Sequence, residues 1–165
     1  MIAVIDYGVG NLFSLAGSLR YIGAEIKVTS KRREIEDSSA VILPGVGAFG
    51  DAYARLEECG LVDVLLSQAR SGKPMLGICL GMQMLFDCSF EYGEHRGLGL
   101  IKGDVCPIAP DLKQNVKVPH MGWNSLKFVR PSPLFRYISE GEYVYFVHSY
   151  YAKNCKEGIT SAAEY

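Results

Sequence analysis

The chain has 165 residues, which is the length of one domain. Apolar residues make up 48% of it and charged residues 21%, a balance typical of a globular protein and not of a disordered one. The net charge is −1 and no run of basic residues occurs, so a nucleic-acid partner has no electrostatic support. No apolar stretch reaches about 18 residues, and no positively charged segment precedes the first apolar run. We therefore predict neither a membrane-spanning helix nor a signal peptide.

The cysteines indicate a reducing compartment. They are odd in number and form no Cys-x-x-Cys pair, which favours free thiols, a cytoplasmic location and no structural zinc. No other cluster of His, Cys or Asp residues has the spacing of metal ligands, so we predict no metal site and no cofactor. The five cysteines are Cys59, Cys79, Cys88, Cys106 and Cys155.

Short β-branched runs alternate with amphipathic stretches over the first half of the chain. Asn11 is suited to cap a helix that Gly23 ends, and Gly60 is expected to interrupt a second helical region. This alternation predicts an α/β fold in three layers, with helices on both faces of a mostly parallel sheet. The first helix has an apolar face at Leu12, Leu15, Ala16, Leu19 and Ile22. Strands are predicted over residues 1–6, 24–30, 39–44 and 73–78, and further helices over residues 52–71 and 80–87.

After Gly97 the pattern changes to short strands without intervening helices. These strands predict an added antiparallel sheet beside the parallel one. The last of them is followed by no helix that would cover it, which is unusual for an α/β domain. The predicted strands span residues 97–108, 115–123, 124–129, 141–152 and 158–165.

Gly77-Ile78-Cys79-Leu80-Gly81 has the glycine-x-nucleophile-x-glycine form between a predicted strand and a predicted helix. This spacing is typical of a sharp turn that holds a nucleophile in a strained conformation, where larger flanking side chains would clash. Such a turn also places Cys79 at a helix N-terminus, which stabilises a thiolate. The backbone amide of Leu80 would then face a developing oxyanion. The alternative is a small buried cysteine between two packing glycines. The other four cysteines have no such frame.

A second glycine-rich segment, "PGVGAFG", follows the third predicted strand. Gly45, Gly47 and Gly50 satisfy the spacing G-x-G-x-x-G, which suggests a dinucleotide-binding loop. That interpretation also needs an acidic residue at the end of the next strand, and the sequence there is "MLGIC". Amides of this loop are better placed to complete an oxyanion hole near Cys79. The alternative is that this segment is only a tight turn before a helix.

These segments together resemble the class I (triad) glutamine amidotransferases. "DYGVGN", "LPGVGAFGDA", "GICLGMQMLF", "GLGLI", "PHMGWN" and "FVHSYYA" occur in the order of that family, from residue 6 to residue 152. "GICLGMQ" is shared widely across the family. "PGVGAFGDA" and "PHMGWN" are narrower and resemble the glutaminase subunits of imidazole glycerol phosphate synthase, from histidine biosynthesis. The resemblance implies the flavodoxin-like fold of the family over residues 1–165.

The resemblance also implies the chemistry. Cys79 is expected to attack the amide of glutamine and form a thioester, with the Leu80 amide and the loop around Gly47 as oxyanion donors. Ammonia leaves, and water then releases glutamate. Gly45, Gln83 and Glu91 match residues at the substrate pocket, and Ser149 and Tyr150 match the pair whose backbone binds the amino-acid end of glutamine. For Gln83 a solvent-facing helix residue, and for Glu91 a plain surface carboxylate, remain alternatives.

The implied partner is a cyclase subunit with a (β/α)8 barrel. It would form a heterodimer with this chain and use the ammonia to make imidazole glycerol phosphate and an aminoimidazole carboxamide ribotide. Met121, Trp123 and Asn124 match the partner-facing edge, together with His120 and Asn11. Trp123 as an ordinary core aromatic is the alternative.

The base of the triad belongs, in the family, to a His-Pro-Glu segment that this sequence does not contain. We expect His148 to be structural or a wall of the pocket, and His95 to be solvated. The resemblance thus implies that the chain lacks the C-terminal segment of the family. Without this segment, we expect it not to hydrolyse glutamine efficiently.

Two other functions are consistent with the sequence. One is a related glutaminase that supplies ammonia for amidination of a surface sugar, which only the acceptor would distinguish. The other is a non-catalytic scaffold or dinucleotide-binding module. Trapping of Cys79 by a glutamine-like electrophile would exclude this second alternative.

Overall fold

A computed structural model describes residues 1–113 and 116–165. Its centre is a parallel sheet of four strands in the order β2-β1-β3-β4. This order places β1 and β3 inside the sheet, where apolar runs are buried on both faces. Each predicted strand of the first half is present. Their bounds are β1 Ile2–Ile5, β2 Ile26–Thr29, β3 Ala40–Gly45 and β4 Met75–Cys79.

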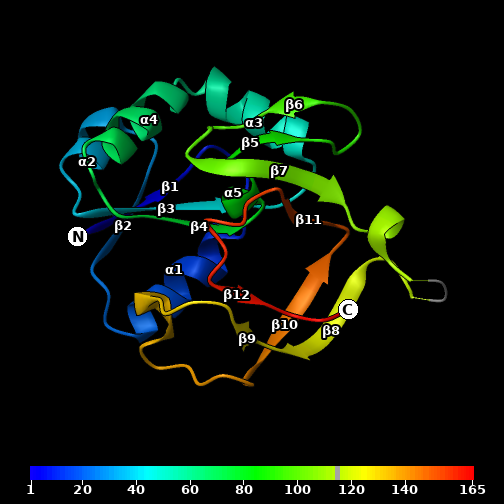
Figure 1. The fold of residues 1–165 in the computed structure, drawn as a ribbon. Helices are drawn as coiled ribbons and strands as arrows, with labels where there is room; N and C mark the ends of the chain where they lie inside the picture. Colours follow the sequence, from blue (N-terminus) through cyan, green and yellow to red (C-terminus); the bar gives the residue numbers. More distant parts are fainter. Residues whose placement is uncertain (114–115) are drawn as a thin grey trace.

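Helices lie on both faces of this sheet, as predicted (Figure 1). α2, α3 and α4 lie on one side and α1 on the other. The main core fills the first of these two layers, where apolar residues of β1 and β3 pack against α3 and α4. The helices are α1 Leu12–Tyr21, α2 Arg32–Glu36, α3 Phe49–Glu58 and α4 Val62–Arg70.

Helix α1 begins where it was predicted to begin, and its apolar face is only partly buried. The side-chain oxygen of Asn11 accepts a hydrogen bond from the Ser14 amide at 3.2 Å, as a capping residue does. Of the predicted apolar face only Ala16 is buried, and Ile22 is largely exposed. The predicted apolar face is thus only partly buried, with Leu12, Leu15 and Leu19 of intermediate exposure.

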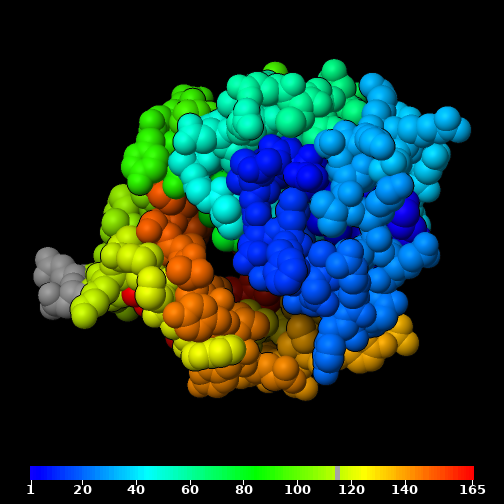
Figure 2. All heavy atoms as spheres, turned by 180° about the vertical axis from the view of Figure 1, so that it is seen from behind, coloured from blue at the N-terminus to red at the C-terminus, as the bar shows by residue number. Residues whose placement is uncertain are grey.

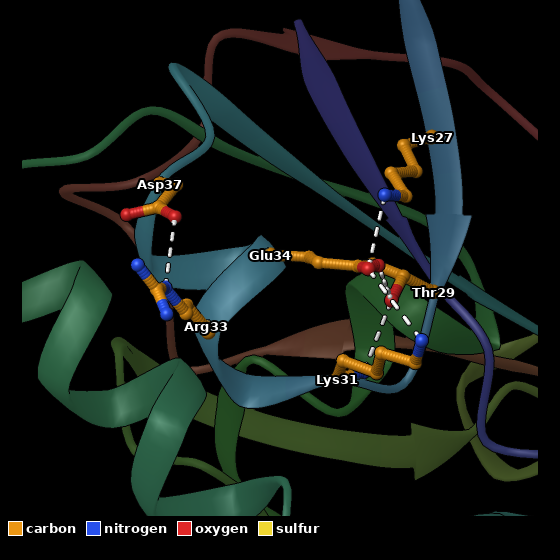
Figure 3. Close-up of polar contacts among 6 residues, drawn as sticks. All are labelled: Lys27, Thr29, Lys31, Arg33, Glu34 and Asp37. Carbon is orange, nitrogen blue, oxygen red and sulfur yellow. Dashed lines mark hydrogen bonds and ion pairs between the residues drawn. The ribbon is translucent and has the colours of Figure 1, made fainter.

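Helix α2 was not predicted, because its five residues are mostly charged. A polar network holds it against β2 (Figure 3). Glu34 accepts a hydrogen bond from the Thr29 hydroxyl and forms an ion pair with Lys27 at 2.9 Å. The Thr29 hydrogen bond, and then Lys27, hold the pKa of Glu34 below its usual range. On the other side of the helix, Arg33 pairs with Asp37.

The helix after Cys79 is shorter than predicted. α5 spans Leu80–Gln83, and the chain then enters strand β5 where the sequence predicted further helix. The carbonyl groups of Met84 and Leu85 accept hydrogen bonds from the amides of Leu98 and Leu100, both at 2.8 Å. These long-range bonds replace helical ones, so the helix ends after one turn.

The second half forms further small sheets, which agrees with the prediction in kind. One has the order β11-β7-β5-β6, and it is mixed because β5 and β7 run parallel. The other two are the antiparallel pairs β8 with β10 and β9 with β12. The bounds are β5 Phe86–Ser89, β6 His95–Arg96, β7 Ile101–Pro107, β8 His120–Ser125, β9 Lys127–Phe128, β10 Tyr143–His148, β11 Tyr150–Lys153 and β12 Ser161–Ala162, with 3-10 helices Ala109–Asp111 and Pro133–Phe135.

Two predictions for this half need correction. Residues 141–152 are not one strand, because the chain turns at Ser149 and passes from the β8–β10 pair to the β11–β7 pair. The strand predicted over residues 115–123 begins only at His120, and its residue 115 lies outside the described residues. Among the described residues, no helix is long and apolar enough to cross a membrane.

Candidate active site

Cys79 lies at the turn between β4 and α5, in a conformation that few side chains adopt. Its φ is 54° and its ψ is −119°, although it is the last residue of strand β4. A non-glycine residue held there costs about 1–3 kcal/mol, and such strain persists where surrounding structure fixes it. The thiol is exposed. The structure thus supports the nucleophile turn and excludes the alternative of a buried structural cysteine.

The glycines around Cys79 are required by close backbone packing. A Cβ atom at Gly81 would overlap the carbonyl oxygen of Leu43, and one at Gly77 would overlap the Cα atom of Met82. A Cβ atom at Gly45 would lie 2.6 Å from the Gly81 nitrogen. Gly45 pairs with Cys79 in the register of β3 and β4 and is buried. Its place in the structure is packing beneath the turn, so the prediction of a substrate contact is not supported for Gly45.

A pocket of about 410 Å³ opens beside Cys79. It brings together most of the residues predicted to bind glutamine, although they lie up to about 100 positions apart in the sequence. Its lining also includes residues that the motifs did not indicate, because an apolar or aromatic residue on a loop carries no distinct signal. The lining residues are Val46, Gly47, Cys79, Leu80, Gln83, Glu91, Tyr92, Pro119, Val147, His148, Ser149 and Tyr150.

A second hollow adjoins the first and shares Cys79, Gln83 and His148 with it. Gln83 is the last residue of α5, about one turn after Cys79, and it lines both hollows. It is therefore not a helix residue that faces only solvent. Seen from behind, strand β10 in orange is separated from the blue N-terminal residues by a depression in the surface (Figure 2). The nucleophile is thus accessible from a concave surface.

The glycine loop lies next to this pocket. Gly47 has a φ of 86°, a value that favours glycine, and lines the pocket with Cys79. Gly50 is explained by packing, because a Cβ atom there would lie 2.6 Å from the ring of His95. His95 also packs against Phe49, with ring centroids 6.3 Å apart. His95 is therefore only partly solvated, because its ring is of intermediate exposure.

Glu91 makes a contact that the sequence did not reveal. Its Oε2 atom accepts a hydrogen bond of 2.6 Å from the backbone amide of Phe49, the first residue of α3. The residue before the helix is Ala48, which offers no capping side chain. Glu91 thus caps α3 from 42 positions away and also lines the pocket. The alternative of a plain surface carboxylate is excluded.

We expect Glu91→Ala and Glu91→Gln to separate these two roles. The alanine variant loses the cap and should lower the free energy of unfolding by about 1 kcal/mol. The glutamine variant keeps an acceptor oxygen for the Phe49 amide, so its stability should stay close to that of the wild type. Both variants lose the charge that would pair with the ammonium group of glutamine, and both should raise the KM for glutamine by about tenfold.

Urea unfolding and initial rates of glutamate formation measure the two effects. Glu94→Gln, an exposed carboxylate in the same loop, serves as the matched control and should change neither. An unchanged KM in Glu91→Gln would leave Glu91 with the capping role alone.

Strand β8 presents the residues predicted to face a partner. Side chains alternate along it, so Met121 and Trp123 are 60% and 69% exposed whereas His120 is only 5% exposed. Trp123 packs edge-to-face on Tyr145 at 5.5 Å, on the surface and not in the core. The prediction that His120 faces a partner is wrong, because it points to the opposite side of β8. Asn124 donates a hydrogen bond to the Glu164 carbonyl.

The remaining four cysteines are free thiols, and the surroundings of Cys88, Cys106 and Cys155 disfavour a thiolate. Burial, together with a hydrogen bond to Asp104 at 3.1 Å, raises the pKa of Cys88 to about 11. Burial likewise raises the pKa of Cys106 and of Cys155. Cys59 is exposed at the end of α3, away from the pocket. In the part of the chain that the structure describes, no group of three or more His, Cys, Asp or Glu residues could hold a metal ion.

Comparison with known proteins assigns the chain to a family whose chemistry fits the geometry around Cys79. The family model described as "Glutamine amidotransferase class-I" matches residues 3–165. The chain belongs to the class I glutamine amidotransferases. Imidazole glycerol phosphate synthase subunit HisH of Bacillus cereus (strain B4264) is 50% identical to this amidotransferase over 165 residues, which are 100% of the chain and 77% of that protein.

A second relative supports the assignment, and a solved structure supports the fold. The subunit HisH of Caldanaerobacter subterraneus subsp. tengcongensis is 47% identical over 166 residues, covering 100% of the chain and 80% of that protein. A crystal structure of a glutamine amidotransferase superposes with a TM-score of 0.74, over 98% of this chain and 79% of that one. Its sequence identity of 18% makes this a similarity of fold. The fold class predicted for this amidotransferase is therefore confirmed.

Proposed function

We propose that the chain is the glutaminase subunit of imidazole glycerol phosphate synthase, acting in the cytosol in histidine biosynthesis. The single observation that carries the proposal is Cys79 in its strained turn, exposed beside a pocket lined by Gln83 and Glu91. The identity of about 50% to subunits of that synthase supports the choice among class I amidotransferases. Glutamine is the proposed substrate, and the products are glutamate and ammonia.

The proposed reaction begins when the thiolate of Cys79 attacks the side-chain amide carbon of glutamine. A carbon–sulfur bond forms and the carbonyl electrons move to oxygen, where the Leu80 amide and the loop at Gly47 are the proposed donors. The carbon–nitrogen bond then breaks, and the nitrogen leaves as ammonia after it receives a proton. Water attacks the resulting thioester, releases glutamate and restores the thiol.

The proton for the departing nitrogen needs a donor, which is normally an imidazole. Both nitrogens of His148 are engaged, one with His120 at 3.0 Å and one with the Tyr150 carbonyl at 2.9 Å. This engagement makes His148 a poor proton donor, although it lines the pocket. We propose that a group other than His148 supplies this proton.

The outward face of β8 and β10 is the proposed surface for a (β/α)8-barrel cyclase. Met121 and Trp123 on β8 are exposed beside Tyr143, Tyr145 and Val147 on β10. Large exposed aromatic and methionine side chains are enriched where proteins bind each other. Strand β10 also reaches the glutamine pocket, through Val147 and His148. Binding of a partner here would thus adjoin the site that releases ammonia.

The decisive experiment measures glutamate formation by the full product of the gene, with and without the barrel cyclase and its nucleotide substrate. We expect the partner with its ligand to stimulate hydrolysis at least about tenfold and to incorporate the ammonia. Trp123→Ala should weaken partner binding by about 2 kcal/mol, because a buried interface tryptophan typically contributes that much. Titration calorimetry measures this loss.

Tyr137→Ala is the control, since Tyr137 is also an exposed aromatic but lies outside β8 and β10. It should bind the partner as the wild type does. Glutaminase activity that stays indifferent to this cyclase and responds to a synthase of surface-sugar amidination would favour that related function instead. A Cys79 thiol that no glutamine-like electrophile labels would point to a scaffold role.

A further inference from the structure

The imidazole rings of His120 on β8 and His148 on β10 face each other on the inward side of this strand pair. His120 and His148 are paired in the antiparallel register, and their Nδ1 and Nε2 atoms lie 3.0 Å apart. His120 is also stacked between aromatic rings, at 4.6 Å from Phe146 and 3.8 Å from Tyr165 between centroids. These contacts leave the His120 ring little freedom to turn. The pair is therefore a fixed element next to the pocket.

The hydrogen-bond partners decide which nitrogen carries each proton. The Nδ1 atom of His148 lies 2.9 Å from the carbonyl oxygen of Tyr150, which can only accept, so this nitrogen carries hydrogen. In a neutral His148 ring the Nε2 atom then has a lone pair and accepts from the Nδ1–H of His120. Burial, and then the neighbouring His148, lower the pKa of His120, which favours the neutral form of the His120 ring. The result is one directed chain from His120 through His148 to Tyr150.

This chain ends on the segment that borders the glutamine pocket. The bond from His148 to the Tyr150 carbonyl closes over Ser149, where the polypeptide passes from β10 to β11. From the other side, the Ser149 carbonyl accepts a hydrogen bond of 2.9 Å from the Ile108 amide. His148, Ser149 and Tyr150 line the pocket together with Cys79. The backbone of this segment is thus held from two directions.

We propose that His148 and His120 are positioning residues of the glutamine site. The hydrogen-bond chain holds the backbone of Ser149 and Tyr150 in the conformation that receives the amino-acid end of glutamine. This inference rests on the proposed function. Because both nitrogens of His148 are engaged, the ring acts on substrate binding and not on proton transfer. Loss of the chain should therefore weaken glutamine binding more than it slows the chemical step.

Isosteric amides separate the two hydrogen bonds. The side-chain nitrogen of asparagine lies where Nδ1 of histidine lies, and the terminal amide of glutamine reaches the place of Nε2. His148→Asn therefore keeps the donor to the Tyr150 carbonyl and loses the acceptor for His120. His148→Gln keeps an acceptor for His120 and loses the donor to Tyr150. By the same logic His120→Asn keeps its donor to His148, and His120→Leu removes it.

The test follows inactivation of the full gene product by 6-diazo-5-oxo-L-norleucine, a glutamine analogue that alkylates the nucleophile. The saturation constant KI reports binding, and the limiting rate reports the chemistry at Cys79. We expect KI to rise about tenfold in His148→Gln and about threefold or less in His148→Asn, with limiting rates within about twofold of each other. His120→Leu should raise KI more than His120→Asn does.

Two measurements distinguish positioning from general damage. Thermal unfolding gives the stability of each variant. Alkylation by iodoacetamide, followed at Cys79 by peptide mass spectrometry because Cys59 is also exposed, reports the reactivity of the nucleophile independently of glutamine binding. We expect iodoacetamide rates within about twofold of the wild type in all four variants. Equal KI values for His148→Asn and His148→Gln would overturn the proposal. It would also be overturned if KI rose among the variants only in proportion to their loss of thermal stability. If His148→Gln does not fold, the KI values of His120→Leu and His120→Asn provide the same comparison.

Failure of the proposed function would look different. In that case the wild type itself would show no saturable inactivation by the analogue and no protection by glutamine. A wild type that saturates normally, with variants that match it in KI, would reject the positioning role alone.

Discussion

Replacing Cys79 with alanine is expected to abolish glutamine hydrolysis while the protein stays folded. The residue is exposed, so the lost sulfur leaves no cavity in the core. Its φ of 54° strains any side chain, and alanine relieves none of that strain and adds none. Removal of the nucleophile of a catalytic triad lowers kcat by about 10⁶, because the remaining groups cannot form the covalent intermediate. Steady-state glutamate formation by the full gene product with its partner measures this loss.

The matched control is Cys59→Ala, which removes another exposed thiol at the end of α3. It should leave kcat and KM for glutamine unchanged. Circular dichroism and the affinity for the partner should be the same for both variants and the wild type. Substantial hydrolysis by purified Cys79→Ala would show that another group forms the intermediate and would reject the assignment.

Gly81→Ala is expected to have the largest effect on stability. The new methyl group would overlap the carbonyl oxygen of Leu43 in β3, a backbone atom inside the sheet that cannot turn away. Either the turn at Cys79 or the pairing of β3 with β4 must shift. Overpacking of this kind costs about 1–3 kcal/mol or more, so we expect a loss of at least about 3 kcal/mol in the free energy of unfolding. Urea unfolding followed by circular dichroism measures it.

Gly17→Ala provides the contrast within the same chain. Gly17 lies in helix α1, and nothing lies within 4 Å of the place a Cβ atom would take. Alanine there should raise stability by about 0.5–1 kcal/mol, because it restricts the unfolded chain and favours helix. A Gly81→Ala protein as stable as the wild type, with Cys79 alkylated at the same rate, would mean that the turn tolerates a side chain there.

Local patterns were sufficient for the parallel sheet and for the nucleophile. The four parallel strands, the helix capped by Asn11 and the turn at Cys79 each arise from residues close together in the sequence. The missed elements have a physical explanation. Helix α2 has one buried apolar residue, Ile35, so its five residues show no periodicity. β6 is only two residues long and depends on its pairing with β5.

Contacts between distant residues corrected the site. His120 and Trp123 share one short motif, yet one is buried and the other exposed, because alternate residues of β8 point to opposite faces. The sequence could not say which set faces inward, since that depends on the position of β10. Residues 141–152 look like one strand, but the turn at Ser149 follows from pairing with two different partners.

The sequence by itself determined the chemistry of the nucleophile, because the spacing of Gly77, Cys79 and Gly81 is a local steric requirement of a strained turn. Only the tertiary structure decided what surrounds it. Glu91 reaches the start of α3 across 42 positions, and His120 meets His148 across 28. Such contacts depend on how the sheets pack, which no local pattern encodes. The reacting atom is thus specified locally, whereas the shape of its pocket is a property of the whole fold.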